Sequence, residues 1–417
     1  MILKIKELLK SNKRWAYVFL SLIIMVLLGT VYSYSVFRVG LESYYKIGAA
    51  KSGIPYMMGL FSYAVFMLIS GKHLDKYKPR NILIFGSLLV SLGWVLSSYT
   101  NSIFLLTVTY GIISGGGVGI AYGVPMSVIA RWFPDKKGFA LGLILVGFGL
   151  SPLITAPIAR FLVEGYGIKE AFLILGLTFG ILLPLLSLPF RNPREEEVIV
   201  YKNKIIDNKV YMDVSLKEML KTKSFKGLYI NFIIGTMIGL TMIGVTTSVG
   251  LDYFNLSLSS VTKLMALFAI FNGLGRPTFG YITDRYSTKN AMLLSYGLII
   301  LSSLSIILLK NNIVVYAIIF SIFWFNLGGW LAIAPTSTLN LYGIKNYSQN
   351  YGLIFTGYGI GAIAGVSTSG FLLDYHGNYH FLFYYIISLC FIGIITSSKY
   401  LNTKSQINLA VKYESLG

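Results

Sequence analysis

Residues 71–80 read Gly-Lys-His-Leu-Asp-Lys-Tyr-Lys-Pro-Arg, and residues 280–289 read Gly-Tyr-Ile-Thr-Asp-Arg-Tyr-Ser-Thr-Lys. Each stretch begins with glycine, has an acid and then a base at its fifth and sixth places, and ends on a base. The two copies start 209 residues apart, 280 minus 71, which is about half of the 417-residue chain. This spacing indicates two duplicated halves in the same orientation.

The composition around these stretches is that of an integral membrane protein. Hydrophobic residues make up 55% of the chain, charged residues only 12%, and the mean hydropathy is +0.69. Apolar runs of about 20 residues recur, which suits spanning helices, whereas the strands of a membrane barrel alternate over about ten residues. We therefore predict an all-α integral membrane protein with twelve transmembrane helices in two six-helix pseudo-repeats. The predicted spans lie near 15–37, 53–71, 81–99, 102–130, 138–161, 168–190, 225–249, 259–282, 289–309, 313–336, 349–373 and 379–400.

The basic residues predict the topology. The net charge of +19 is concentrated between the apolar runs, and the even-numbered turns are much richer in Lys and Arg than the odd-numbered ones. The positive-inside rule then places both termini in the cytoplasm of a multi-pass protein of the cell membrane. Because these bases form no continuous face with stacking aromatics, we expect lipid and no nucleic acid as partner.

A polar stretch divides the chain. We predict an N-terminal six-helix bundle over 1–190, a cytoplasmic linker over 191–224, and a C-terminal six-helix bundle with a short tail over 225–417. The single Cys390 excludes an intrachain disulfide and a cysteine-cluster metal site, and we expect no cofactor or metal. The functional unit is expected to be a monomer.

The repeated stretch is predicted to act as a conformational latch. Glycine lets a helix end approach its neighbour closely, the acid accepts hydrogen bonds from a facing helix terminus, and the bases hold the loop at an anionic surface. A basic turn that serves topology alone is the alternative. The latch residues are Gly71, Asp75, Lys76, Arg80, Gly280, Asp284, Arg285 and Lys289.

With its twelve spans, central linker and paired motif, the chain resembles the major facilitator superfamily. The first copy departs from the usual pattern, with Lys78 and Pro79 where Gly and Arg are common. Gly29 to Phe37, Gly119 to Gly138 and Asn272 to Arg276 resemble the oxalate/formate antiporter family, which is related to monocarboxylate transporters. The resemblance implies alternating access of the two halves about a central site for a small organic anion.

Arg276 is the charge found deepest in any predicted span. A cation near mid-bilayer costs roughly 3 kcal/mol on insertion scales, so it favours a ligand site or a transport pathway. A guanidinium holds one carboxylate through a planar pair of donors. Asn272 lies one helical turn earlier and is expected to bond either the guanidinium through its carbonyl or the substrate through its amide.

Aromatic side chains complete the predicted substrate site. The resemblance implies that spans one, four and eleven line the cavity, which adds Tyr32, Tyr122 and Tyr358 as candidates and Phe355 as a weaker one. For each tyrosine, plain packing or interface anchoring is the alternative. The resemblance also implies that oxalate carriers use a second cation in span eleven, and residues 355–361, Phe-Thr-Gly-Tyr-Gly-Ile-Gly, contain none. We therefore expect a monocarboxylate of the lactate, pyruvate, acetate or formate type.

The coupling mode is left open between proton symport and anion exchange. Proton-coupled relatives often have an aspartate at the position of Asn272, and an amide cannot titrate. An oxalate/formate-type dicarboxylate exchanger and a membrane carboxylate sensor that does not transport are the competing hypotheses. An enzyme is not expected, because no paired carboxylate, histidine cluster or nucleophile with a base lies within the spans.

Overall fold

The computed structural model describes residues 2–47, 49–74, 76–202, 213–309, 312–376 and 379–401. These residues are helical, with turns and no strand. The predicted latch acid Asp75 lies outside them. By contact density the chain divides into unit 1, Met1–Asn208, and unit 2, Lys209–Gly417, and we describe each by itself. The division falls inside the predicted linker, whose cytoplasmic placement stays a prediction, as do the domain limits at 190 and 225.

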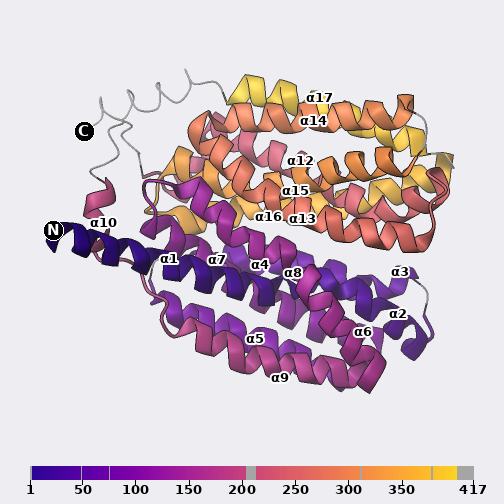
Figure 1. Cartoon of the computed structure of the whole chain (residues 1–417), viewed down its shortest axis with the longest axis horizontal. Helices are drawn as coiled ribbons and strands as arrows, with labels where there is room; N and C mark the ends of the chain where they lie inside the picture. The colour runs from indigo at the N-terminus through magenta and orange to yellow at the C-terminus, as the bar shows by residue number, and fades with distance from the viewer. Residues whose placement is uncertain are drawn as a thin grey trace. The chain divides into compact units, whose positions relative to one another are not determined.

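Unit 1 contains ten α-helices and two irregular helical segments in its described residues (Figure 1). These are α1 (Ile2–Leu28), the 3₁₀ segment η1 (Gly29–Ser33), α2 (Tyr34–Tyr45), α3 (Ala49–Ser52), α4 (Ile54–Gly71), α5 (Pro79–Ser98), α6 (Ile103–Leu106), the π-helix η2 (Thr107–Ser114), α7 (Gly115–Trp132), α8 (Lys137–Tyr166), α9 (Ile168–Ser187) and α10 (Glu195–Lys202). In Figure 1, α5 and α9 run side by side, and they are in contact, as are α4 with α7 and α1 with α8.

Unit 2 contains seven α-helices and one π-helix in its described residues. These are α11 (Leu216–Lys221), α12 (Lys223–Ser248), the π-helix η3 (Val249–Tyr253), α13 (Leu258–Arg285), α14 (Thr288–Leu308), α15 (Ile313–Tyr342), α16 (Tyr347–His376) and α17 (Tyr379–Tyr400). The main packing pairs are α13 with α15, α12 with α16, and α14 with α17. Apolar helices associate in a bilayer through close van der Waals packing and interhelical hydrogen bonds.

Ten helical stretches of the described residues are long and apolar enough to span a membrane. They match ten of the twelve predicted spans. The remaining predictions, near 259–282 and 349–373, fall on α13 and α16, which have 28 and 30 residues. Both are long enough to cross a bilayer, but polar residues lower their hydropathy: α13 includes Lys263, Arg276 and Asp284, and α16 is rich in glycine, serine and threonine.

The first predicted span, 15–37, is not one continuous α-helix. It changes to 3₁₀ geometry at Gly29–Ser33. A Cβ added at Gly29 would lie 2.6 Å from the Cβ of Ser151 on α8, and the Ser151 hydroxyl donates to the Val26 carbonyl at 2.6 Å. That carbonyl is also the acceptor that the residue 30 amide uses in a continuous α-helix, so α8 contacts this helix at the point where its geometry changes.

The two ends of the predicted linker that are described each belong to a different unit. In unit 1, Arg191 pairs with Glu197 of α10, with both Nη–Oε distances at 2.7 Å. In unit 2, Ser215 caps α11 in a capping box with Glu218, and the Val214 amide donates to the Tyr342 carbonyl at 2.9 Å. Each end is therefore fixed on its own unit by hydrogen bonds.

Candidate functional site

Arg276 lies in the middle of α13 and is completely buried. Its Nη2 donates to the Asn272 Oδ1 at 3.2 Å, one helical turn earlier on the same face. Asn272 is itself buried, and its Nδ2 donates to the Trp324 carbonyl of α15 at 3.0 Å. From the sequence, Asn272 was expected to bond either the guanidinium through its carbonyl or the substrate through its amide. In the structure its carbonyl oxygen accepts from the guanidinium, and its amide donates to the backbone of α15.

The orientation of the Asn272 amide follows from its neighbours. A guanidinium only donates hydrogen bonds, so the Asn272 oxygen must face it, and a backbone carbonyl only accepts, so the nitrogen must face Trp324. Reversing the amide would oppose donor to donor and acceptor to acceptor. Asn272 therefore links the Arg276 side chain to the α15 backbone through two hydrogen bonds.

Glycines bring α13 and α15 close enough for this arrangement. A Cβ added at Gly328 would clash with the Asn272 carbonyl oxygen, and one at Gly275 would clash with the Phe325 carbonyl oxygen. A third glycine, Gly329, faces the ring of Phe279 in the same way. The two backbones meet at the turn that contains Asn272, which is why its side chain reaches a carbonyl on the neighbouring helix.

The second group of predicted residues in unit 2 lies on α16. Tyr358 is fully buried and stacks on Phe355, with ring centroids 5.2 Å apart and planes at 14°. Phe355 contacts Tyr351 at 5.7 Å, and Tyr351 stacks on Tyr347 at the same distance. Spacings of three and four residues align these rings on one face of the helix. Packing alone explains this stack, which was one of the two predicted readings of Tyr358.

In unit 1 the predicted Tyr32 and Tyr122 meet around one phenylalanine. Tyr32 of η1 makes an edge contact with Phe148 of α8 at 5.1 Å, and Tyr122 of α7 makes another at 5.3 Å. Tyr63 of α4 completes the cluster, 5.1 Å from Tyr122. Sequence reasoning missed Phe148 and Tyr63, and Phe148 carried only a weak signal, its place between Gly147 and Gly149 in a glycine-rich span.

The latch residues are partly placed. Gly71 ends α4 and is buried, while Lys76 and Arg80 are exposed. In the second copy, Gly280 is buried and Arg285 exposed. The Asp284 carboxylate accepts from the Asn340 amide of α15 at 3.2 Å, near the end of that helix. Lys289 lies in the first turn of α14. Their action as a latch stays a prediction.

Residues 15–343 match the sequence model of the Major Facilitator Superfamily. The chain belongs to this superfamily. The match covers most of the chain, so it confirms the resemblance drawn from the paired motif.

Two relatives narrow the place of the chain within the superfamily. It is 27% identical over 357 residues to the oxalate:formate antiporter of Oxalobacter formigenes, covering 85% of this chain and 84% of the relative. It is 25% identical over 373 residues to monocarboxylate transporter 12 of Xenopus laevis, covering 83% and 79%. The predicted superfamily is therefore confirmed, and the chain is similar to a protein named as an oxalate:formate antiporter and to one named as a monocarboxylate transporter.

Solved structures confirm the fold. The chain aligns with the proton:xylose symporter XylE at a TM-score of 0.69 and 13% identity, over 94% of this chain and 97% of that one. It aligns with FucP in its outward conformation at a TM-score of 0.66 and 14% identity, over 93% and 99%. The protein is thus an all-α, multi-pass membrane transporter of the major facilitator fold, and not an enzyme.

Proposed function

We propose that this transporter moves a small monocarboxylate of the lactate, pyruvate, acetate or formate type across the cell membrane by alternating access. The observation that carries the proposal is the complete burial of Arg276 in α13, the helix at the predicted span 259–282, with its guanidinium bonded to Asn272. A buried cation is costly in a bilayer, and a docked carboxylate offsets part of that cost. The names of both relatives support an organic anion as substrate.

The number of cations favours a single carboxylate. Residues 347–376, which form α16, contain no Lys or Arg, so that helix offers no second cation. One guanidinium matches one carboxylate in charge and geometry. In unit 2, the Phe355 ring and the Tyr358 hydroxyl offer an apolar surface and a hydrogen-bonding group suited to an acid of one to three carbons.

A dicarboxylate exchanger of the oxalate/formate type is the second candidate. The observation in its favour is the similarity to the oxalate:formate antiporter along 85% of the chain. Coupling by proton symport or by anion exchange is compatible with either substrate class. Asn272 does not titrate, so a proton that accompanies the substrate has to bind elsewhere. Our proposal keeps both termini cytoplasmic and the functional unit monomeric.

The test is uptake of labelled lactate into proteoliposomes by the wild type and by Arg276→Gln. We expect Arg276→Gln to lose uptake and Arg276→Lys to keep part of it, because lysine retains the charge but not the planar pair of donors. Arg160→Gln is the matched control, since Arg160 is an exposed arginine that pairs with Glu164 and lies outside the proposed site. Undiminished uptake by Arg276→Gln would refute the proposal.

A second measurement separates the substrate classes. Competition of lactate uptake by a panel of monocarboxylates and dicarboxylates, at several pH values and with and without internal substrate, reports specificity and coupling together. Strong competition by oxalate together with weak competition by monocarboxylates would favour the dicarboxylate exchanger. Binding of carboxylates in a thermal-shift assay without flux in liposomes would point to the sensor hypothesis instead.

A further inference from the structure

A basic groove of about 540 Å³ opens in unit 1, at the ends of three spanning helices. One wall is the turn between α4 and α5, and the other is the segment that follows α9. Its lining residues are Lys76, Tyr77, Lys78, Pro79, Arg80, Leu188, Pro189, Phe190, Arg191 and Asn192. Because it lies where spans end, this groove is at the level of a membrane surface.

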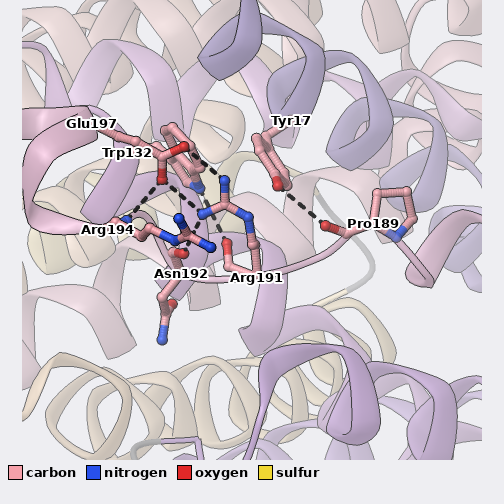
Figure 2. A network of polar contacts seen from close by, with 7 residues as sticks. All are labelled: Tyr17, Trp132, Pro189, Arg191, Asn192, Arg194 and Glu197. Atoms are coloured by element: carbon pink, nitrogen blue, oxygen red, sulfur yellow. Dashed lines mark hydrogen bonds and ion pairs between the residues drawn. The ribbon is translucent and has the colours of Figure 1, made fainter. Parts of the chain in front are cut away.

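One wall of the groove is held by a network of hydrogen bonds and an ion pair, as Figure 2 shows. The Arg191 guanidinium forms its two-pronged pair with Glu197 and lies over the Trp132 ring, 5.3 Å from the centroid. The Trp132 indole donates to the Arg191 carbonyl at 3.1 Å, and the Tyr17 hydroxyl donates to the Pro189 carbonyl at 3.1 Å. The hydrogen bond from Arg191 to Glu197 raises the pKa of Arg191, so this side chain stays charged.

The other wall supplies the excess charge. Lys76, Lys78 and Arg80 are all exposed, and among the described residues no ion pair is recorded for any of them. Glu197, the acid next to the groove, is already engaged by Arg191 and by the Arg194 amide at 2.8 Å. Three cations gathered at one end of a groove favour an anionic ligand.

The internal repeat shows that one of these three cations, Lys78, is particular to the first half. The places of Lys78 and Pro79 correspond, 209 residues later, to Ser287 and Thr288. Ser287 caps α14 by accepting from the Asn290 amide at 3.1 Å, and Thr288 donates to Ser337 at 2.8 Å. Lys78, the N-cap residue of α5, makes no such side-chain cap. The first copy thus has a cation where the second has a self-contained cap.

An apolar groove borders the basic one at Tyr77. Tyr77, 60% exposed, lines both the basic groove and a second groove of about 430 Å³. The second groove is formed by α4, α5 and α7, and its lining includes Ile69 and Phe85, which are 48% and 57% exposed. Charge at one end and apolar surface at the other match an amphipathic ligand. A small soluble anion would leave the apolar surface uncovered.

We propose that the basic groove and the neighbouring apolar groove together bind an anionic glycerophospholipid. Its phosphate lies among Lys76, Lys78 and Arg80, against the wall fixed by Arg191, and an acyl chain lies past Tyr77 along the apolar groove. Free phosphate and glycerol phosphate carry the same phosphate group as the lipid. Only the lipid also has an acyl chain that fits the apolar groove, so the apolar groove favours the lipid. Such a lipid holds the turn between α4 and α5, the same turn that contains the first copy of the predicted latch.

The test measures lipid binding to delipidated full-length protein in detergent, by native mass spectrometry with phosphatidylglycerol and phosphatidylcholine. We expect phosphatidylglycerol to bind about tenfold tighter, and the triple variant Lys76→Gln/Lys78→Gln/Arg80→Gln to lose that preference. The matched control is Lys217→Gln/Lys221→Gln/Lys226→Gln, which removes the same charge from exposed positions of unit 2. Melting curves of both triple variants in the same detergent establish that they are folded.

Two further arms make the result decisive. The single variant Lys78→Ser, which copies the residue of the second repeat, should weaken phosphatidylglycerol binding by about threefold without altering the melting temperature. Competition by inorganic phosphate or glycerol 3-phosphate at millimolar concentration should be weak. Equal loss of preference in the two triple variants would overturn the groove as the site, and displacement of the lipid by free phosphate would overturn the lipid as its ligand.

Discussion

Replacing Asn272 with leucine removes the connection between Arg276 and α15 while keeping a similar side-chain volume. Two hydrogen bonds disappear, one from Arg276 at 3.2 Å and one to the Trp324 carbonyl at 3.0 Å. The lost bond to the Trp324 carbonyl costs about 0.5–1.5 kcal/mol, because that carbonyl keeps the backbone donor of its own helix, and the loss of a bond to a charged donor costs about 1.5–3 kcal/mol. We therefore expect a loss of about 2–4 kcal/mol in stability, after some relaxation of both groups.

The same substitution should affect substrate binding through the position of the guanidinium. A two-pronged contact with a carboxylate depends on the orientation of a planar group, so an arginine that has lost its support should bind at least about tenfold more weakly. In proteoliposomes this appears as a raised KM for lactate with a smaller change in the maximal rate. The substrate-induced thermal shift of the purified protein should fall in parallel.

A buried asparagine on α15 provides the control. Asn326 is 1% exposed, and its amide donates to the Ile322 carbonyl of its own helix at 2.8 Å. Asn326→Leu should lower stability without changing the KM, because its side-chain amide bonds within one helix. If Asn272→Leu lowered stability but left the KM for lactate unchanged, the positioning role of Asn272 would be wrong.

Two other substitutions test the packing that supports the fold. Gly328→Ala should destabilise the protein by about 1–3 kcal/mol and impair transport, because its methyl group meets the Asn272 carbonyl. The control is Gly297→Ala on α14, whose methyl group meets no atom within 4 Å, so this variant should be neutral or more stable. Equal melting temperatures of the two variants would contradict this prediction. Arg191→Gln should cost about 1–2 kcal/mol through the Glu197 pair and the Trp132 ring. The pKa of Arg191 is raised, so its contribution is complete below the ordinary arginine pKa and is lost only as pH rises past it. The stability difference should therefore be constant between pH 6 and 9, and a steep change in that window would show that another group is responsible.

Much of the candidate site was accessible to sequence reasoning because its chemistry is local. The cost of a buried charge singles out Arg276, and helical periodicity places Asn272 beside it, so their hydrogen bond was one of two predicted possibilities. The partners that come from other helices were not predictable. Trp324 contributes a backbone carbonyl, which every residue has, and its distance of 52 positions from Asn272 leaves no local pattern.

The sequence by itself determined the class of this protein, a helical membrane transporter built from two repeats. Hydropathy and the spacing of the paired motif at 71–80 and 280–289 can be read along the chain without knowledge of its folding. Tertiary structure decided what depends on the approach of separate helices. The 3₁₀ segment at Gly29 lies where Ser151 of α8 donates to the Val26 carbonyl, a contact between residues 125 positions apart. The basic groove exists because the segment after α9 lies against the turn before α5. Contacts between segments about a hundred residues apart arise from packing, and packing is a property of the folded chain.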